Sequence, residues 1–344
     1  MVNKFNTALI IGSGAFGTSI ASILSNNFQQ VIIKTRCLET YKNLLQGKNE
    51  KYLKGSILAS NIKGALTFEE VDSLIENKID LVILGIPTTA ITGFLYDNSS
   101  KIEEYLKLDI PVVSLSKGID PTTLELPDDL YFNFFSDYRD NFTFLSGPSF
   151  AREIMEEQIT LVSLAGRSKR VMNQVSNMMV TDYFKIMNNY DVKGVLLGGA
   201  LKNILAIAGG IIEGLGYNYN TRAAMITRGI AEMLRFGKVF NARPETFYGL
   251  SGMGDLILST TGDLSRNKNF GLEISKGRTP EEILKGLDYV VEGYRTTQAA
   301  YRLSEKYDIR ARIFNGVYSV LFEHIDPRIA IKKIMMAPMR FEVE

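Results

Sequence analysis

The glycine-rich run GSGAFG at residues 12–17 constrains the fold of this chain more than any other feature. It follows a short apolar run at 7–12 and opens a segment of helical periodicity that continues to Leu24. Glycine is needed there because the chain turns tightly and its backbone must approach a pyrophosphate, which the amides at the helix start then bind. The spacing alone is weak, and a structural turn is the alternative, but the place between strand and helix predicts dinucleotide binding. The predicted contacts are Gly12, Gly14 and Gly17.

Strand-length apolar runs continue as far as residue 187. They lie at 30–35, 80–87, 110–116, 142–147, 159–165 and 183–187. Apolar strands separated by helical segments predict a parallel sheet covered on both faces. From about Asp191 the strand-like runs stop, and helical segments follow at 191–216, 220–238, 281–287, 293–307 and 314–323. We therefore predict an α/β chain, with a Rossmann-like nucleotide-binding domain at 1–189 and an all-helical substrate and catalytic domain at 190–344.

Composition excludes several classes of chemistry. The chain has one cysteine, Cys37, and one histidine, His324, so it has no intramolecular disulfide and we expect no metal site. A proton carrier would then be a lysine, an acid or a tyrosine. The net charge of +1 argues against a nucleic-acid partner. We find neither a signal peptide nor 18 uninterrupted apolar residues, so we expect a cytoplasmic protein without a membrane span.

The end of the second predicted strand bears on the choice of cofactor. An NAD site usually has an acidic residue there for the ribose hydroxyls, but this strand ends Lys34-Thr35-Arg36-Cys37, and the first acid is Glu39. Arg36 would suit the 2′-phosphate of NADPH, so the sequence favours NADPH over NADH. The alternative is that Lys34 and Arg36 are solvated charges at the edge of the sheet.

The segment 198–216 reads as a helix although it is rich in glycine, and it carries Lys202 and Asn203 in an otherwise apolar run. At 100° per residue, small residues and Glu213 share the face of Lys202, while large aliphatic residues lie opposite. We interpret the Lys202 face as vacant, with room for a substrate and with the lysine as catalytic acid/base. The alternative is a surface lysine on a helix that contacts another helix through small residues.

Further polar candidates follow strands or lie in glycine turns. Lys117 and the Gly147-Pro148-Ser149 turn follow two apolar runs, at the edge of the sheet where ligands of open α/β sheets bind. Asp255 ends a Gly-Met-Gly-Asp turn. The run Ser265-Arg266-Asn267 offers hydroxyl, guanidinium and amide donors in a row, a combination suited to phosphate.

With these motifs, the chain resembles the bacterial-type NAD(P)-dependent glycerol-3-phosphate dehydrogenases over nearly its whole length. The matching motifs, in order, are GSGAFGT (12–18), SLSKGID (114–120), SGPSFARE (146–153), GGALKNILAIAGG (198–210), TRAAMITRGIAEM (221–233), GLSGMGDLILS (249–259), SRNKNFG (265–271) and VVEGYRTT (290–297). So many motifs in one order make the resemblance specific.

The resemblance implies a reversible reduction of dihydroxyacetone phosphate to sn-glycerol 3-phosphate, for glycerophospholipid synthesis, in a cytoplasmic homodimer. It implies that Lys202 is the proton donor and acceptor, with Lys117, Asn203 and Asp255 as further catalytic residues. The positions implied around the substrate are Lys117, Gly147, Ser149, Lys202, Asp255, Ser265, Arg266 and Asn267. The implied cofactor positions are Ser13, Phe16, Arg36, Lys117, Ala151, Arg266 and Glu292. One departure is Ser259-Thr260, where many members have threonine-cysteine, although the hydroxyl is kept.

Three other functions are compatible with parts of this pattern. A β-hydroxyacid dehydrogenase also combines a nucleotide domain, a helical domain and a lysine, but the Ser265-Arg266-Asn267 run favours a phosphorylated substrate. A nucleotide-sugar dehydrogenase needs a catalytic cysteine in its later domain, and Cys37 lies in the first. A nicotinamide sensor without turnover is disfavoured because the full set of Lys202, Asn203, Asp255 and Arg266 is present.

Overall fold

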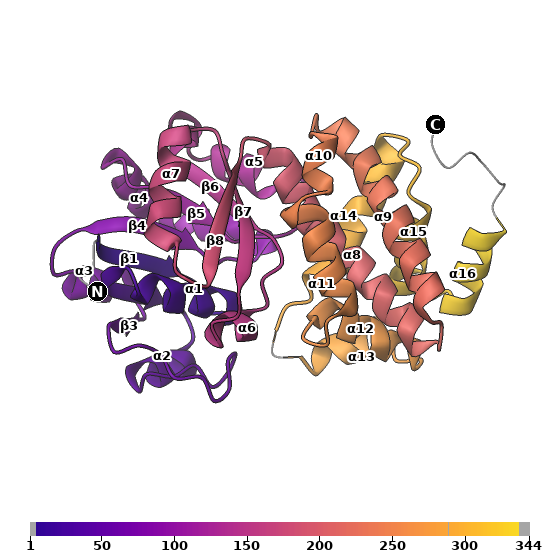
Figure 1. Cartoon of the computed structure of the whole chain (residues 1–344), viewed down its shortest axis with the longest axis horizontal. Helices are drawn as coiled ribbons and strands as arrows, with labels where there is room; N and C mark the ends of the chain where they lie inside the picture. Colours follow the sequence, from indigo (N-terminus) through magenta and orange to yellow (C-terminus); the bar gives the residue numbers. More distant parts are fainter. Residues whose placement is uncertain (1–4, 288, 337–344) are drawn as a thin grey trace. The chain divides into compact units, whose positions relative to one another are not determined.

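The computed structural model describes residues 5–287 and 289–336 (Figure 1). Its contacts divide the chain into two units, one of Met1–Lys117 with Glu125–Leu196 and one of Gly118–Leu124 with Leu197–Glu344. The division falls later than the predicted boundary at 189/190 because the chain passes from one unit to the other inside the continuous helix α8 (Val192–Gly214). A helix interior carries no polar break that a reading of the sequence could detect.

The first unit contains an eight-stranded sheet with the order β3-β2-β1-β4-β5-β6-β7-β8. The strands are β1 (Phe5–Ile11), β2 (Phe28–Lys34), β3 (Ile62–Ala65), β4 (Ile79–Leu84), β5 (Val112–Ser114), β6 (Phe142–Ser146), β7 (Thr160–Gly166) and β8 (Phe184–Asn189). The helices are α1 (Ala15–Ser25), α2 (Leu38–Leu45), α3 (Phe68–Leu74), η1 (Thr88–Ala90), α4 (Ile91–Lys107), α5 (Pro127–Phe132), η2 (Ser136–Asn141), α6 (Ala151–Met155) and α7 (Lys169–Met179).

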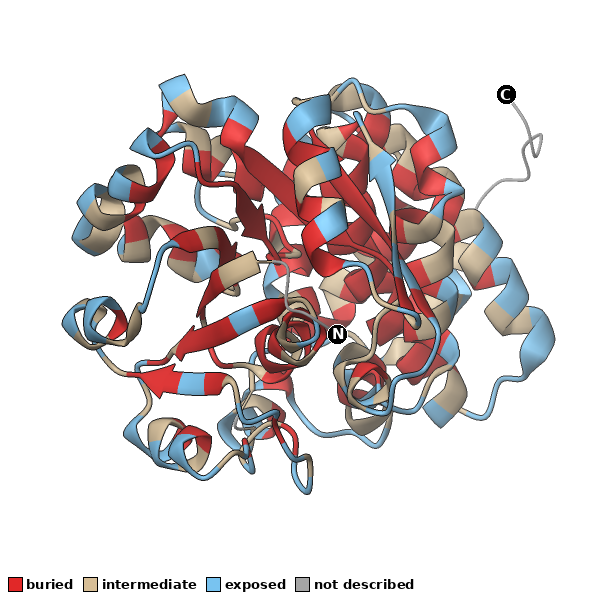
Figure 2. Ribbon diagram, turned by 60° about the vertical axis from the view of Figure 1, so that its left-hand side comes forward, coloured by how far each residue is buried: buried red, intermediate tan, exposed pale blue. Residues whose placement is uncertain are grey.

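Both faces of the central strands are buried, as continuous apolar runs predict. Ala8 and Ile10 lie in a cluster with residues of α1 and α7. Leu9, which lies between them in β1, and its partner Ile32 in β2 also have an exposed fraction of 0%. Figure 2 shows these strands in the colour of buried residues. The predicted Rossmann-like α/β fold is therefore confirmed.

The prediction of an entirely parallel sheet was wrong at one pair. β6 and β7 are antiparallel, with Thr143 opposite Gly166, whereas β7 and β8 are again parallel. A parallel crossover usually needs a helix that spans the sheet, but the link between β6 and β7 contains only the five-residue α6. The prediction also missed β3, whose four residues are too few to form a distinct apolar run.

The described part of the second unit is helical, which confirms the predicted class. Its elements are α8, α9 (Tyr219–Val239), α10 (Pro244–Phe247), η3 (Leu250–Gly254), α11 (Asp255–Thr261), α12 (Arg266–Ser275), α13 (Pro280–Lys285), α14 (Glu292–Lys306), α15 (Arg312–Phe322) and α16 (Pro327–Met335). Within the described residues, α8 alone is long and apolar enough to cross a membrane, and its most apolar stretch is 100% buried inside the protein, as in a core helix.

The glycines of α8 bring neighbouring backbones together. A Cβ at Gly210 would overlap the carbonyl oxygen of Lys268 in α12, and a Cβ at Gly271 of α12 would overlap the carbonyl oxygen of Ile207 in α8. A Cβ at Gly198 would lie 2.7 Å from the carbonyl oxygen of Ser251. Glycine costs about 1 kcal/mol in a helix relative to alanine, and here the close packing of the helices offsets that cost.

Candidate active site

The glycine-rich loop between β1 and α1 has the geometry of a dinucleotide-binding turn. Gly12 has φ +116°, which favours glycine, and a Cβ there would overlap the carbonyl oxygen of Gly85 beyond β4. A Cβ at Gly17 would overlap the carbonyl oxygen of Gly12. At Gly14, by contrast, no described atom beyond the two chain neighbours lies within 4 Å of the Cβ position, and this residue caps α1 without a side chain. The start of α1 is thus open to an anion, so these residues fit a dinucleotide's pyrophosphate.

Uncharged hydrogen bonds hold this loop in place. The hydroxyls of Ser13 and Thr35 lie 2.7 Å apart, which ties the loop to the end of β2. Asn49 Nδ2 donates to the carbonyl oxygen of Ser13 at 2.9 Å and to Thr18 Oγ1 at 2.8 Å. Sequence reasoning missed Thr35 and Asn49 as parts of the site. Asn49 lies between β2 and β3, outside every motif, and no local signal could have found it.

The end of β2 presents two basic side chains. Lys34 Nζ lies 4.5 Å from the ring centroid of Phe68, and partial burial lowers the pKa of this lysine against the opposing effect of Glu69. Arg36 is exposed. The carboxylate of Glu39, the first acid after the strand, lies 3.8 Å from Lys51 Nζ. The local charge beyond β2 is therefore suited to a phosphate.

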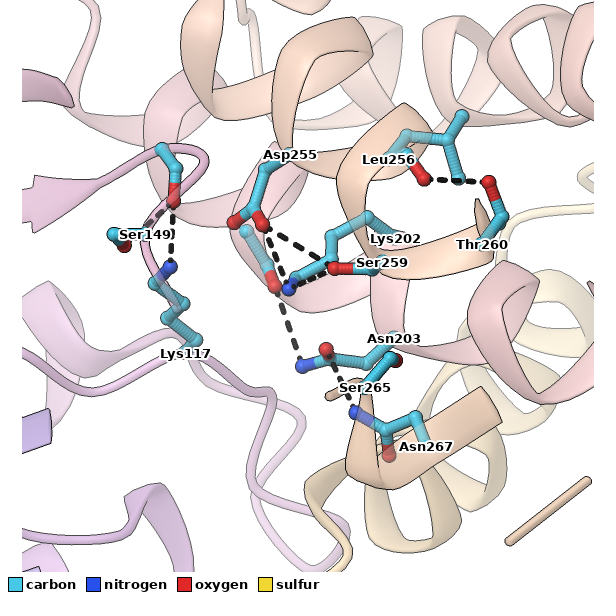
Figure 3. Close-up of polar contacts among 12 residues, drawn as sticks. Lys117, Ser149, Lys202, Asn203, Asp255, Leu256, Ser259, Thr260, Ser265 and Asn267 are labelled. Carbon is cyan, nitrogen blue, oxygen red and sulfur yellow. Dashed lines mark hydrogen bonds and ion pairs between the residues drawn. The ribbon is translucent and has the colours of Figure 1, made fainter. Parts of the chain in front are cut away.

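Separate motifs of the first unit meet around Gly147. Lys117 Nζ donates to the carbonyl oxygen of Gly147 at 3.2 Å (Figure 3). The same Nζ lies 5.4 Å from the ring centroid of Phe16. Ser149 Oγ donates to the same carbonyl oxygen at 2.9 Å. Ala151 begins α6 directly after this turn. The structure thus brings together the predicted residues Phe16, Lys117, Gly147 and Ser149.

In the second unit, Lys202 of α8 lies against two residues of α11. Its Nζ donates to Asp255 Oδ1 at 2.9 Å and to Ser259 Oγ at 2.7 Å, and Ser259 Oγ donates to Asp255 Oδ1 at 3.3 Å (Figure 3). Asp255 and Ser259 are four residues apart on a helix, so they share a face. The exposed fractions of Lys202 and Asp255 are only 8% and 2%. An ammonium, a carboxylate and a hydroxyl are therefore held together almost without water.

The prediction that the face around Lys202 is vacant was wrong. Gly209 packs on Thr260, which would lie 3.4 Å from a Cβ at that position, and Ala206 is fully buried. Glu213, further along the same face, pairs with Arg222 at 2.5 Å. Small residues on this face make room for α11 rather than for a ligand, because a helical period gives the direction of a side chain and not the identity of its neighbour.

An amide chain links three helices beside Lys202. Asn267 Nδ2 of α12 donates to Asn203 Oδ1 of α8 at 2.9 Å, and Asn267 Oδ1 accepts from the amide of Gly293 in α14 at 3.0 Å. Asn203 Nδ2 in turn donates to the carbonyl oxygen of Gly199 at 3.3 Å. The predicted Glu292 precedes Gly293 as the first residue of α14. This chain fixes the orientation of both asparagine amides.

The predicted phosphate run lies at the N-terminus of α12. Ser265 is the N-cap, and its side-chain oxygen accepts from the amide of Lys268 at 3.3 Å. Arg266 is exposed, and its guanidinium lies 4.8 Å from the ring centroid of Tyr289. Asn267 is partly buried and engaged in the amide chain. Of the three predicted donors, Arg266 is the one that the structure presents to solvent.

Comparisons with known proteins agree along the whole chain. Residues 7–172 match the family model of the N-terminus of NAD-dependent glycerol-3-phosphate dehydrogenase, and residues 191–332 match that of its C-terminus. A glycerol-3-phosphate dehydrogenase [NAD(P)+] of Shouchella clausii is 39% identical over 342 residues, 97% of each chain. The enzyme of that name from Syntrophotalea carbinolica is 37% identical over 337 residues, which cover 97% of this chain and 99% of that one.

A comparison of three-dimensional structures points to the same family. The crystal structure of glycerol-3-phosphate dehydrogenase from Coxiella burnetii superposes with a TM-score of 0.87 at 27% identity, covering 96% of this chain and 99% of that one. With relatives of this identity along nearly its whole length, the chain belongs to the NAD-dependent glycerol-3-phosphate dehydrogenases, a family of nicotinamide-dependent oxidoreductases, as its motifs predicted.

Proposed function

We propose that this chain reduces dihydroxyacetone phosphate to sn-glycerol 3-phosphate, reversibly, for glycerophospholipid synthesis, with Lys202 as the proton donor. The observation that carries the proposal is the buried cluster of Lys202, Asp255 and Ser259, in which a carboxylate and a hydroxyl contact one ammonium. In this proposal residues 1–189 bind the cofactor and residues 190–344 supply the acid. The names of the relatives support the same reaction.

Each residue of the cluster would have a distinct part in the reaction. The glycine-rich loop would hold the nicotinamide cofactor, whose chemistry when bound would be transfer of a hydride to the C2 carbonyl carbon. The Lys202 ammonium would hydrogen-bond the carbonyl oxygen and transfer a proton to it as negative charge develops there. Asp255 and Ser259 would hold the ammonium at a fixed point, since both contact Nζ within 3 Å. A fixed donor reduces the reorganisation needed during the reaction.

The substrate phosphate would bind at the start of α12. Arg266 is exposed there, and a helix N-terminus favours an anion. Asn203 and Asn267 would orient substrate hydroxyls through amides that are already fixed by hydrogen bonds. The full set of proposed substrate residues is Lys117, Gly147, Ser149, Lys202, Asn203, Asp255, Ser265, Arg266 and Asn267.

The cofactor would lie on the glycine-rich loop, and we propose that NADPH is preferred over NADH. Arg36 supports this preference because it is exposed just beyond β2, and no acidic residue follows this strand before Glu39. The proposed cofactor residues are Gly12, Ser13, Gly14, Phe16, Gly17, Arg36, Lys117, Ala151, Arg266 and Glu292. Arg36→Ala should raise the Kd for NADPH about tenfold, as expected for loss of one charged hydrogen bond, and should leave the Kd for NADH within about twofold.

The deciding experiment measures oxidation of NADPH and NADH with dihydroxyacetone phosphate, by loss of reduced-nicotinamide absorbance. Wild type should turn over, and Lys202→Met should lower kcat about 10²–10⁴-fold, the usual share of a general acid. Lys268→Met is the matched control, because Lys268 is also buried and paired with acids but lies outside the cluster. A wild type that binds NADPH but never oxidises it with this substrate contradicts the proposal.

The homodimer stays a prediction. Sedimentation velocity of the full-length protein checks it.

A further inference from the structure

Asn49 is a buried polar residue that contacts the glycine-rich loop from the connection between β2 and β3. Its exposed fraction is 0%, and its Nδ2 donates to the Ser13 carbonyl oxygen at 2.9 Å and to Thr18 Oγ1 at 2.8 Å. Thr18 Oγ1 itself donates to the Ser13 carbonyl oxygen at 3.3 Å. The Thr18 hydroxyl proton is thereby used, so this oxygen accepts from Asn49. The side-chain amide must therefore present its NH₂ end to the loop.

The oxygen of the same side-chain amide makes no comparable hydrogen bond among the described residues. Among the described residues, Asn49 Oδ1 has no hydrogen-bond partner although it is buried. An unpaired buried acceptor costs free energy. Because the unpaired oxygen is unfavourable, the two hydrogen bonds donated by Nδ2 are the favourable contribution of this side chain. One acceptor belongs to the loop and the other to the first turn of α1.

The contact fixes the direction of one peptide plane. In a trans peptide the carbonyl and the following N–H point in opposite directions. With the Ser13 carbonyl oxygen held by Asn49, the amide of Gly14 points away from Asn49. Beyond its two chain neighbours, no described atom lies within 4 Å of the Cβ position of Gly14, where α1 begins. An anion can therefore approach the Gly14 backbone without meeting a side chain.

A second contact extends the network to β2. The Ser13 hydroxyl lies 2.7 Å from Thr35 Oγ1, and Thr35 Oγ1 accepts from the amide of Cys37 at 3.2 Å. Asn49, Ser13 and Thr35 thus connect the loop with the segment that carries Arg36. All three groups are uncharged, so they add no negative charge beside an incoming diphosphate.

We propose that Asn49 is a positioning residue for the cofactor: it sets the peptide between Ser13 and Gly14 so that the Gly14 amide donates to the dinucleotide diphosphate. The inference rests on the proposed function, because it assumes that the loop binds NADPH. The Asn49 side chain donates its hydrogen bonds to the loop and to the first turn of α1. Its removal should weaken nucleotide binding, and the change should fall on the KM for the cofactor rather than on kcat.

The test is titration of the full-length protein with NADPH, followed by nucleotide fluorescence without substrate. Asn49→Ala should raise the Kd about tenfold. Asn61→Ala is the matched control, because Asn61 Nδ2 also donates two hydrogen bonds at 3.0 Å, to the carbonyl oxygens of Ser25 and Phe28 at the other end of α1. That variant should lose a similar amount of thermal stability and keep its Kd within about twofold of wild type.

Two results would overturn the inference: a wild-type Kd in folded Asn49→Ala, or an equal rise in Asn61→Ala, which would show a general loosening of α1. If Asn49→Ala does not fold, Thr18→Val decides, since it removes the second acceptor at similar volume. Its Kd should rise about threefold, and an unchanged value contradicts the inference. A wild type that binds no NADPH contradicts the proposed function instead, so the two failures are distinguishable.

Discussion

In two glycine-rich regions of this chain, glycine has opposite structural roles. In the loop before α1, Gly14 leaves an open space, with no described atom beyond its chain neighbours within 4 Å of its Cβ position. In α8, Gly210 allows close packing instead, since a Cβ there would overlap the backbone of α12. One glycine thus leaves room where we propose that the cofactor binds, and the other lets a helix approach. Sequence pattern alone does not separate the two, because the distinction lies in what faces the missing side chain.

The polar groups of the two regions also differ. The loop is held by uncharged groups, namely Ser13, Thr35 and Asn49. The second unit instead buries charged groups, among them the pair Lys202 and Asp255. The uncharged groups add no negative charge beside the N-terminus of α1, whereas Lys202 and Asp255 place opposite charges where little water screens them. We therefore expect substitutions in the loop to change ligand affinity and those in the helical unit to change stability.

The largest effect on stability is expected at Gly210. Gly210→Ala should lower the free energy of unfolding by about 3 kcal/mol, the upper range for overpacking, because its Cβ meets backbone that cannot rotate away. Chemical denaturation checks this. Gly93→Ala is the control in α4, where no described atom lies within 4 Å of the Cβ position. It should be neutral or should stabilise the protein by about 0.5 kcal/mol. Equal effects at the two positions would remove the packing explanation.

The next effect concerns the buried charges of the helical unit. Glu232 of α9 accepts from the amides of Ile313 and Phe314 at 3.0 and 3.2 Å, and burial raises its pKa from 4.5 to about 7. The folded state then binds more protons than the unfolded state between these values, so this contribution is full below pH 4.5 and is lost as pH rises through 7.

Glu232→Gln isolates this contribution, since it cannot ionise. The difference in unfolding free energy between wild type and the variant should shift by about 2–3 kcal/mol against wild type from pH 5 to pH 8, following the size of the pKa change. Urea denaturation at a series of pH values measures it. A difference independent of pH would mean that Glu232 has an ordinary pKa in the folded protein.

The smallest effect in free energy is expected in the loop. Gly14 has φ −64°, which alanine also adopts, so Gly14→Ala should fold with wild-type stability to within about 0.5 kcal/mol. Its methyl group would stand where a diphosphate approaches, and the Kd for NADPH should rise about tenfold, or 1.4 kcal/mol. Paired calorimetry and nucleotide titration measure both quantities. Loss of stability without loss of affinity would reverse the comparison with α8.

Most of the fold could be predicted because its signals are local. β1, β2 and β4 are buried on both faces, so each appears as an apolar run. The antiparallel direction of β7 could not be predicted, since a strand of either direction has the same composition. The four-residue β3 is likewise too short to stand out.

The site was predictable to the extent that it lies in motifs. Lys202, Asp255 and Asn267 belong to motifs, and the structure places each in a hydrogen-bonded cluster. Asn49 lies 36 residues from Ser13 in a connection without a motif, and only the folded chain brings them together. The vacant face was predicted wrongly because periodicity cannot show that α11 covers it.

The depth of the lysines has a consequence for chemical labelling. Among the lysines of the described residues, only Lys202 and Lys268 are buried, while Lys117 is partly exposed. An amine-acylating reagent applied to the native protein will therefore modify surface lysines first and Lys117 later. Lys202 will acquire the label after the surface lysines, and Lys268, whose exposed fraction is 2%, only when the helices around α8 separate. The order of labelling, read by mass spectrometry, thus reports the opening of the helical unit without any assay of activity.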